Sequence, residues 1–205
     1  LMSTYICHPN LANDNLSGIA VATWLGKWLA GRDNRLTYRI LFMPETIGAI
    51  YYISRHLEAL KRNVIAGYVL TCMGDERTWS YIPSKSGDTL ADRAIEKTKT
   101  WAVDCPGFDE YSFLDRGSDE RQYCAPGVDL PVCSVMRSKY HTYPEYHTDK
   151  DNLSLISEKG LQESFEVMQS IIETLEANTP VQAAMLCEPM LSKRYLHSSL
   201  GGKAR

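Results

Sequence analysis

Residues 3–18 read STYICHPNLANDNLSG and pass from one structural pattern to another within a short distance. The opening STYIC is apolar and β-branched, which is typical of a buried strand, whereas NLSG leads into the periodic apolar run IAVATWLGKWL of a helix. Such a strand places His8 at its carboxyl end, and the polar turn PNLAND returns the chain to Asp14 just before the helix. In parallel α/β sheets this edge is where ligands bind.

The rest of the chain alternates in the same way. Apolar, β-branched or aromatic runs at 3–7, 37–43, 64–72 and 131–136 predict strands, and they alternate with helical patterns at about 15–30, 45–62, 87–102 and 157–177. This alternation favours right-handed crossovers and a mostly parallel sheet covered by helices on both faces. Residues 103–130 are rich in Gly, Asp, Arg and Pro, so we expect a long irregular loop there.

Composition excludes several classes of protein. The 205 residues are 44% hydrophobic and 23% charged, which suits one medium-sized α/β domain, and the net charge of -3 offers no general basic surface for nucleic acid. We expect no membrane segment, because no apolar run reaches 18 residues, and no secretory signal begins the chain. A cytoplasmic protein is the default expectation.

The two ends of the chain differ in character. The sequence starts LMSTYIC, without an initiating methionine, and enters a core-type strand at once, so we expect it to be an excerpt of a longer polypeptide that lacks upstream elements. We expect one domain over residues 1–177 and a C-terminal connector over residues 178–205.

Cysteines are scattered without metal-type spacing. Cys7, Cys72 and Cys133 fall in apolar runs that predict strands, so we expect buried free thiols rather than disulfides or metal ligands.

Other strand ends also carry polar groups. The strand LTYRILFMP is followed by Glu45, and the late segment SKYHTYPEYHTDKDNLSLI holds His147. Each residue has a structural alternative: Asp14 as a helix N-cap, His8 as a buried structural histidine, and Glu45 as an acid in a first helical turn. Together, however, two imidazoles and one carboxylate form a three-ligand zinc set that leaves a position open for water.

These motifs carry a family resemblance. The order H…ANDNLSG, an acid-plus-Gly motif after the next strand, GSDERQY and YHTDKDN is similar to that of zinc-dependent aminopeptidases of the bacterial leucyl aminopeptidase and glutaminyl cyclase type, over most of residues 3–177. More narrowly, the chain resembles an aminopeptidase-like branch with an inserted small domain upstream and often a winged helix downstream. The resemblance implies a three-layer α/β/α sandwich with a mixed, mostly parallel sheet.

The resemblance also implies roles for particular residues. It makes His8 the first zinc-binding histidine, Asp14 the carboxylate that bridges two metals in fully equipped relatives, and His147 the late histidine ligand. Glu45 matches the general base, which would take the proton from a metal-activated water during amide hydrolysis.

Two departures from the family pattern bear on the number of metal ions. The usual Glu-Glu pair of the family reads Glu45-Thr46 here, and Thr71 stands where the family has an aspartate. Because two negative oxygens are missing, we expect one zinc ion rather than two. Two alternatives stay open: Glu45 is itself a ligand, or Asp75 or Glu120 supplies the missing oxygen.

Substrate contacts are assigned from the same motifs. Asp119 matches an acid that shapes the site in relatives and Glu120 replaces a histidine, and either carboxylate could hold a substrate α-amine; a solvated charged loop is the alternative. Tyr146, with two neighbouring tyrosines, is a candidate aromatic wall near His147.

The sequence thus predicts a zinc-dependent aminopeptidase-like hydrolase acting on a peptide or other small amide. The alternatives are a catalytically degenerate peptidase fold that binds a ligand in a regulator, and a scaffold without metal. Nucleic acid binding is expected only through a downstream winged helix outside this chain, and oligomer formation is left open.

Overall fold

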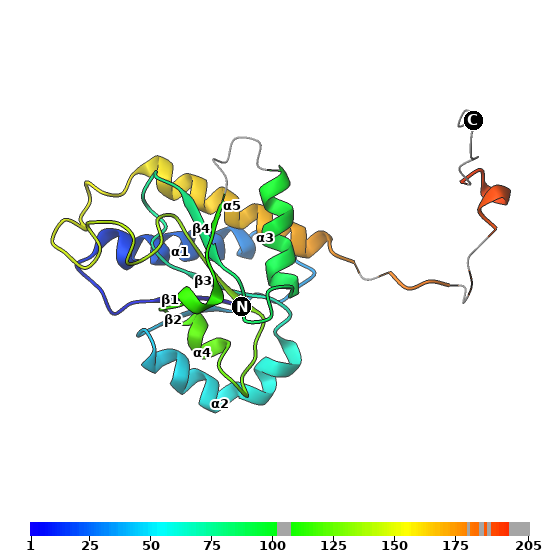
Figure 1. Ribbon diagram of the computed structural model, residues 1–205, viewed down its shortest axis with the longest axis horizontal. Helices are drawn as coiled ribbons and strands as arrows, with labels where there is room; N and C mark the ends of the chain where they lie inside the picture. The colour runs from blue at the N-terminus through cyan, green and yellow to red at the C-terminus, as the bar shows by residue number, and fades with distance from the viewer. Residues whose placement is uncertain (102–107, 180, 185–186, 188–189, 197–205) are drawn as a thin grey trace.

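The computed structural model describes residues 1–101, 108–179, 181–184, 187 and 190–196. Within them, one sheet is formed by six strands: β1 (Met2–Tyr5), β2 (Ile40–Met43), β3 (Gly67–Leu70), β4 (Trp79–Ile82), β5 (Phe108–Glu110) and β6 (Val132–Met136). The main helices are α1 (Gly18–Ala30), α2 (Ile47–Asn63), α3 (Leu90–Trp101), α4 (Glu120–Tyr123) and α5 (Glu158–Ala177). Shorter helical turns are η1 (Ala12–Ser17), η2 (Phe113–Asp115) and η3 (Leu191–Arg194) (Figure 1).

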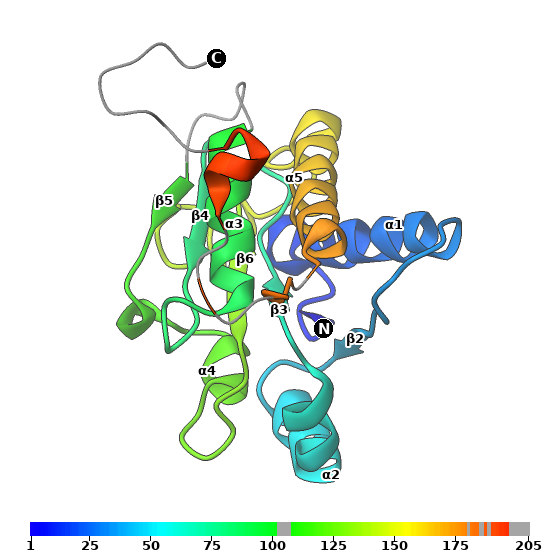
Figure 2. The same ribbon diagram turned by 90° about the vertical axis from the view of Figure 1, so that its right-hand side faces the viewer.

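The sheet is mixed and mostly parallel. Its strand order is β2-β1-β3-β6-β4-β5, and all neighbours are parallel except β4 and β6. Helices cover both faces, and Figure 2 shows α1 and α5 on the opposite side of the sheet from α2. The predicted three-layer α/β/α class with a mixed sheet is therefore confirmed.

The two helical layers follow from the side-chain alternation of the central strands. In β3, Tyr68 and Leu70 pack in the core with α1, α3 and α5, whereas Val69 between them packs with α2 and α4. In β6, Val135 packs in the first of these cores and Val132 in the second. Because successive residues of a strand point to opposite faces, a fully apolar strand requires a helical layer on each side.

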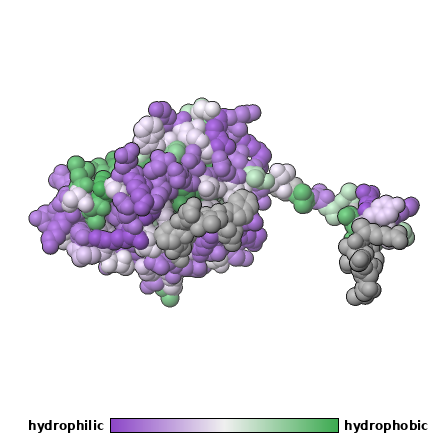
Figure 3. All heavy atoms as spheres, turned by 90° about the horizontal axis from the view of Figure 1, so that it is seen from above, coloured by the Kyte–Doolittle hydropathy of each residue, from purple (hydrophilic) through white to green (hydrophobic). Residues whose placement is uncertain are grey.

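The outer surface of α5 is polar where this helix faces solvent. On α5, Met168, Ile171 and Ile172 are buried while Glu166 and Glu173 are exposed, as expected for an amphipathic helix. Figure 3 accordingly shows a mostly hydrophilic face. No helix in the described part of the chain is long and apolar enough to cross a bilayer.

Two parts of the sequence prediction need correction. The strand β4 was not predicted, and residues 103–130 are not one irregular loop, because they contain β5, η2 and α4. These elements have only three or four residues each, too few to show a period in the sequence. Residues 102–107 lie outside the described residues.

Candidate metal centre

His8, Asp14 and His147 come together at the carboxyl edge of the sheet. His8 follows β1, Asp14 lies within η1, and His147 lies in the loop after β6. One ligand-type atom of each lies within 4.8 Å of those of the other two. The imidazole rings of His8 and His147 have centroids 5.1 Å apart. The structure therefore places all three sequence-predicted ligands in one cluster, although His147 is far from the other two in the sequence.

Asp14 is the buried member of this cluster. Its carboxylate is divided: Oδ1 accepts a hydrogen bond from the hydroxyl of Tyr5, and Oδ2 lies 2.9 Å from Nε2 of His147. This contact is an ion pair only when His147 is protonated, and Oδ2 has no hydrogen-bond partner among the described residues. A buried carboxylate oxygen without a donor is costly, and a cation shared with the imidazoles would compensate it. The residues present therefore fit a metal ion.

Asp14 does not act as the helix cap that the sequence allowed. The N-cap of α1 is Ser17, and Asp14 lies in η1 with backbone angles outside the helical region. The backbone is instead held by Asp151, whose carboxylate accepts from the amides of Asn13 (2.6 Å) and Asp14 (3.0 Å). Asp151 closes the loop that carries His147, so these bonds fix His147 and Asp14 relative to each other. The motif YHTDKDN contains Asp151, but it does not indicate these bonds to the backbone of Asn13 and Asp14.

Each histidine has a neighbour that limits its orientation. Nδ1 of His8 lies 3.2 Å from Sγ of Cys7, and the ring of Tyr146 stacks on that of His147 with centroids 4.0 Å apart and 12° between the planes. A hydrogen-bonded neighbour limits which ring nitrogen of a histidine faces a metal, and a stacked ring limits the plane of the imidazole. The expectation that Cys7 is buried is wrong, because β1 already ends at Tyr5 and leaves the thiol exposed.

Glu45 lies beside the cluster, on the His8 side. Its carboxylate is within 4.8 Å of ligand-type atoms of His8 and Cys7, and Oε1 accepts a hydrogen bond from Oγ of Ser118 (2.8 Å). The next residue, Thr46, has φ of +61°, a strained value for a β-branched residue. Strained backbone of this kind is concentrated at functional sites.

Asp119 holds the backbone of the Glu45–Thr46 segment by a hydrogen bond. Its Oδ1 accepts from the amide of Thr46 (2.7 Å), and its Oδ2 is buried with no partner among the described residues. Burial raises the pKa of Asp119 to about 7, assisted by the nearby carboxylates of Glu45 and Glu120 and opposed by the Thr46 hydrogen bond. Asp119 is fully buried and does not reach the surface. Through the amide of Thr46 it holds the backbone next to Glu45.

The two acids considered as replacement ligands are engaged elsewhere. Glu120 is buried and accepts from the amides of Gly117 and Ser118 and from two hydroxyls. Asp75 is buried and accepts from the backbone and hydroxyl of Ser138, from the Asn13 side chain and from the Arg77 amide. These bonds leave neither acid free to turn toward His8.

The other predicted tyrosines are structural anchors. The hydroxyl of Tyr140 donates to Glu120, and that of Tyr143 lies 3.5 Å from Asp151. Both side chains are buried, so of the predicted aromatic wall only Tyr146 lies beside the cluster.

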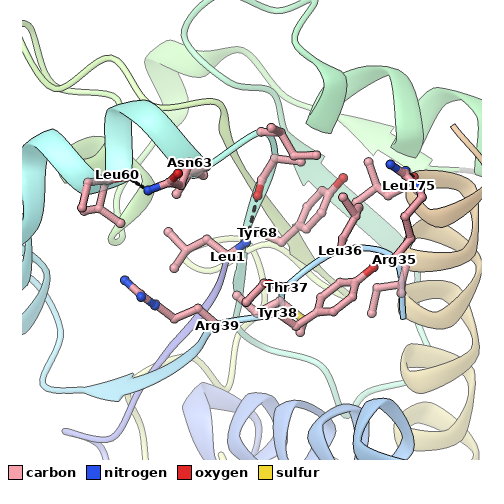
Figure 4. A pocket seen from close by; sticks show the side chains of 16 residues that line it. Leu1, Arg35, Leu36, Thr37, Tyr38, Arg39, Leu60, Asn63, Tyr68 and Leu175 are labelled. Atoms are coloured by element: carbon pink, nitrogen blue, oxygen red, sulfur yellow. Dashed lines mark hydrogen bonds between the residues drawn. The ribbon is translucent and has the colours of Figure 1, made fainter. Parts of the chain in front are cut away.

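A separate cavity lies at the opposite end of β1. Its volume is about 470 Å³, and Figure 4 shows it between Leu1, Tyr38, Leu60 and Tyr68. Its lining includes no histidine, cysteine or carboxylate among the described residues. The cluster of two histidines and a carboxylate at the carboxyl edge therefore lies outside this cavity.

Similar structures support the fold. A crystal structure of a Clostridium acetobutylicum protein described provisionally as a peptidase is 38% identical with a TM-score of 0.83, covering 95% of this chain and 47% of that one. BSAP, a zinc aminopeptidase from Bacillus subtilis, has a TM-score of 0.69 at 15% identity, covering 87% and 46%. An aminopeptidase from Aneurinibacillus sp. strain AM-1 has a TM-score of 0.67 at 16% identity, covering 88% and 46%. The chain thus has an aminopeptidase-like fold.

A curated relative and a family profile complete the comparison. A Clostridium acetobutylicum protein named, provisionally, as a polysaccharide biosynthesis protein with an aminopeptidase-like domain is 42% identical over 205 residues, which cover 98% of this chain and 46% of that protein. The chain therefore spans about half the length of this relative. The profile described as "Domain of unknown function (DUF4910)" matches residues 1–178, and the chain belongs to this family.

Proposed function

We propose that the chain is a zinc-dependent amide or peptide hydrolase domain of the aminopeptidase type. The observation that carries the proposal is the buried Oδ2 of Asp14, which lacks a hydrogen-bond partner among the described residues and lies 2.9 Å from Nε2 of His147, in one cluster with His8. His8, Asp14 and His147 would hold the ion, and the zinc aminopeptidase fold of BSAP supports the choice of metal.

A bound zinc ion would supply an activated water and a polarised carbonyl. Glu45 is the base in this proposal: it takes the proton of the attacking water and passes it to the leaving amine. The hydroxyl of Ser118 occupies Oε1 of Glu45, so Oε2 is the oxygen left for the proton. Asp119 holds the adjacent amide of Thr46 and thereby positions Glu45.

We favour one ion over two. Thr71 and Thr46 offer neutral hydroxyls where a second divalent ion requires negative oxygens. Asp75 and Glu120 do not replace them, because their carboxylates already accept several hydrogen bonds each.

The substrate in this proposal is a peptide or another small amide. Tyr146, half-buried beside His147, is the proposed aromatic contact for it. The sequence predicts that Asp119 or Glu120 holds a substrate α-amine; because both are fully buried, we propose that they shape the site from behind instead.

We also propose a domain over residues 1–177 followed by a connector over residues 178–205. In this proposal the chain is part of a longer cytoplasmic polypeptide of the branch with a winged helix, and the winged helix is the part that contacts nucleic acid. Figure 1 supports the division, since the described residues after α5 run away from the sheet.

The test combines zinc analysis with a panel of aminoacyl and peptidyl amides. We expect one zinc ion per chain and chelator-sensitive hydrolysis. Glu45→Gln should keep the zinc and lower turnover by roughly 10²–10⁴-fold, the usual effect of losing a general base. Glu58→Gln, an exposed change on α2, is the matched control and should change neither quantity.

Two results would contradict the proposal. Loss of most zinc from Glu45→Gln would make Glu45 a ligand rather than the base. Retained zinc in a wild-type protein without hydrolysis of any amide would favour a ligand-binding module instead.

A further inference from the structure

Tyr5 ends β1 directly behind the metal cluster. Its side chain is 2% exposed, and its hydroxyl donates to Oδ1 of Asp14. The same hydroxyl lies 2.6 Å from Oγ1 of Thr71, which is fully buried at the end of β3. The strands β1 and β3 are parallel neighbours, so their ends bring these two hydroxyls together behind Asp14.

This arrangement divides the carboxylate of Asp14 into two different oxygens. Oδ2 faces His147, whereas Oδ1 is occupied by Tyr5. A carboxylate that bridges two ions must offer one oxygen to each. The space behind Oδ1 is also filled, because Sγ of Cys72 lies 3.4 Å from Oγ1 of Thr71 and 3.5 Å from the hydroxyl of Tyr143.

We propose that Tyr5 is a positioning residue that, with Thr71, dedicates Asp14 to a single metal ion and fills the place of a second ion with hydroxyl groups. The inference rests on the proposed function, since it assumes that Asp14 is a ligand. It assigns to Tyr5 a role that the strand pattern STYIC did not indicate, because a tyrosine at the end of a buried strand usually serves packing.

The experiment measures zinc per chain after loading with excess zinc and desalting. The wild type and Thr71→Asp should hold one ion, because Tyr5 still occupies Asp14 in both. The double variant Tyr5→Phe/Thr71→Asp should hold two, since it frees Oδ1 and adds a negative oxygen beside it. The matched control is Tyr123→Phe/Thr71→Asp, which removes another buried tyrosine hydroxyl, one that donates to Ser3, and should stay at one ion.

The outcomes separate this inference from the proposed function. A wild type without stoichiometric zinc would remove the proposed function itself. One ion in a folded double variant, or two in either the wild type or Thr71→Asp, would overturn the role of Tyr5 and leave the hydrolase proposal standing.

A second measurement keeps the inference testable if the double variant does not fold. Tyr5→Phe alone should weaken zinc binding by the roughly 10–100-fold that outer-shell partners of metal ligands contribute. Unchanged zinc affinity in a calorimetric titration of Tyr5→Phe would show that Tyr5 does not position Asp14.

Discussion

Two groups of buried acids lie close together at the carboxyl edge of the sheet, and they differ in how their oxygens are used. Asp75 and Glu120 each accept four hydrogen bonds, largely from loop amides and hydroxyls. Asp14 accepts one hydrogen bond on Oδ1, and its Oδ2 has no hydrogen-bond partner in the described part of the chain. Carboxylates saturated by donors stabilise the fold, whereas a buried oxygen without a donor is available for a cation.

Asp75 of the first group, together with another buried acid, Asp151, also builds the frame for Asp14. The side chain of Asn13 donates to Asp75, and its backbone amide donates to Asp151. Asn13 immediately precedes Asp14, so two structural acids hold the segment that presents the candidate ligand. This division of roles predicts that similar substitutions in the two groups affect different properties.

The largest expected effect is the difference between two variants, Asp14→Asn and Asp75→Asn. Structural zinc sites with four ligands bind by about 10–16 kcal/mol, so losing one direct ligand should weaken zinc binding by roughly 3–4 kcal/mol, or about 10²–10³-fold. Asp14→Asn should show that loss in a zinc titration without destabilising the metal-free fold, because it neutralises a buried oxygen that has no hydrogen-bond partner in the described structure.

Asp75→Asn should show the opposite pattern. Hydrogen bonds to charged groups contribute about 1.5–3 kcal/mol, so the metal-free protein should lose at least about 2 kcal/mol in urea unfolding. Equal losses of stability in the two variants would mean that the free oxygen of Asp14 does not distinguish it from its neighbour.

Much of the fold could be predicted from local pattern, but the difference between these acids could not. β1, β2, β3 and β6 coincide with apolar runs. For β1, β3 and β6 the reason is burial on both faces, whereas β2 is a partly exposed edge strand. Asp14, Asp75 and Glu120 look alike in a sequence, whereas donor saturation depends on amides from loops that meet only in the folded chain. The motif order picks out His8, Asp14 and His147, whereas nothing in STYIC or YHTDKDN indicates that Tyr5 and Asp151 hold Asp14 in place.

An intermediate effect is expected at Asp119, which falls between the two groups: one oxygen has a donor, and the other has none among the described residues. Its folded pKa of about 7 exceeds the ordinary value of 3.8, so the folded state binds the proton more tightly and stability falls as pH rises from about 4 to 7. One pKa unit corresponds to about 1.4 kcal/mol, so the stability lost over this pH range has an upper limit near 4 kcal/mol. We expect a loss of about 2–3 kcal/mol.

Asp119→Asn removes that titration while keeping an oxygen for the amide of Thr46. In the metal-free protein, the free energy of unfolding of the variant, measured in urea, should equal that of the wild type near pH 4 and exceed it by about 2–3 kcal/mol at pH 8. A constant difference between the two proteins at both pH values would show that Asp119 does not titrate between them.

The smallest expected effect concerns Tyr146, which limits the orientation of His147 by stacking rather than by a hydrogen bond. Aromatic pairs contribute about 0.5–1.5 kcal/mol beyond their buried area, so Tyr146→Leu should weaken zinc binding by only about 2–10-fold. Tyr51→Leu, at an exposed position on α2, is the control and should leave zinc binding unchanged. Because His147 is about half exposed while Asp14 is buried, the proposed ligand held by stacking should tolerate change better than the proposed ligand held by hydrogen bonds. A loss in Tyr146→Leu as large as that in Asp14→Asn would place the tyrosine ring among the groups that contact the ion.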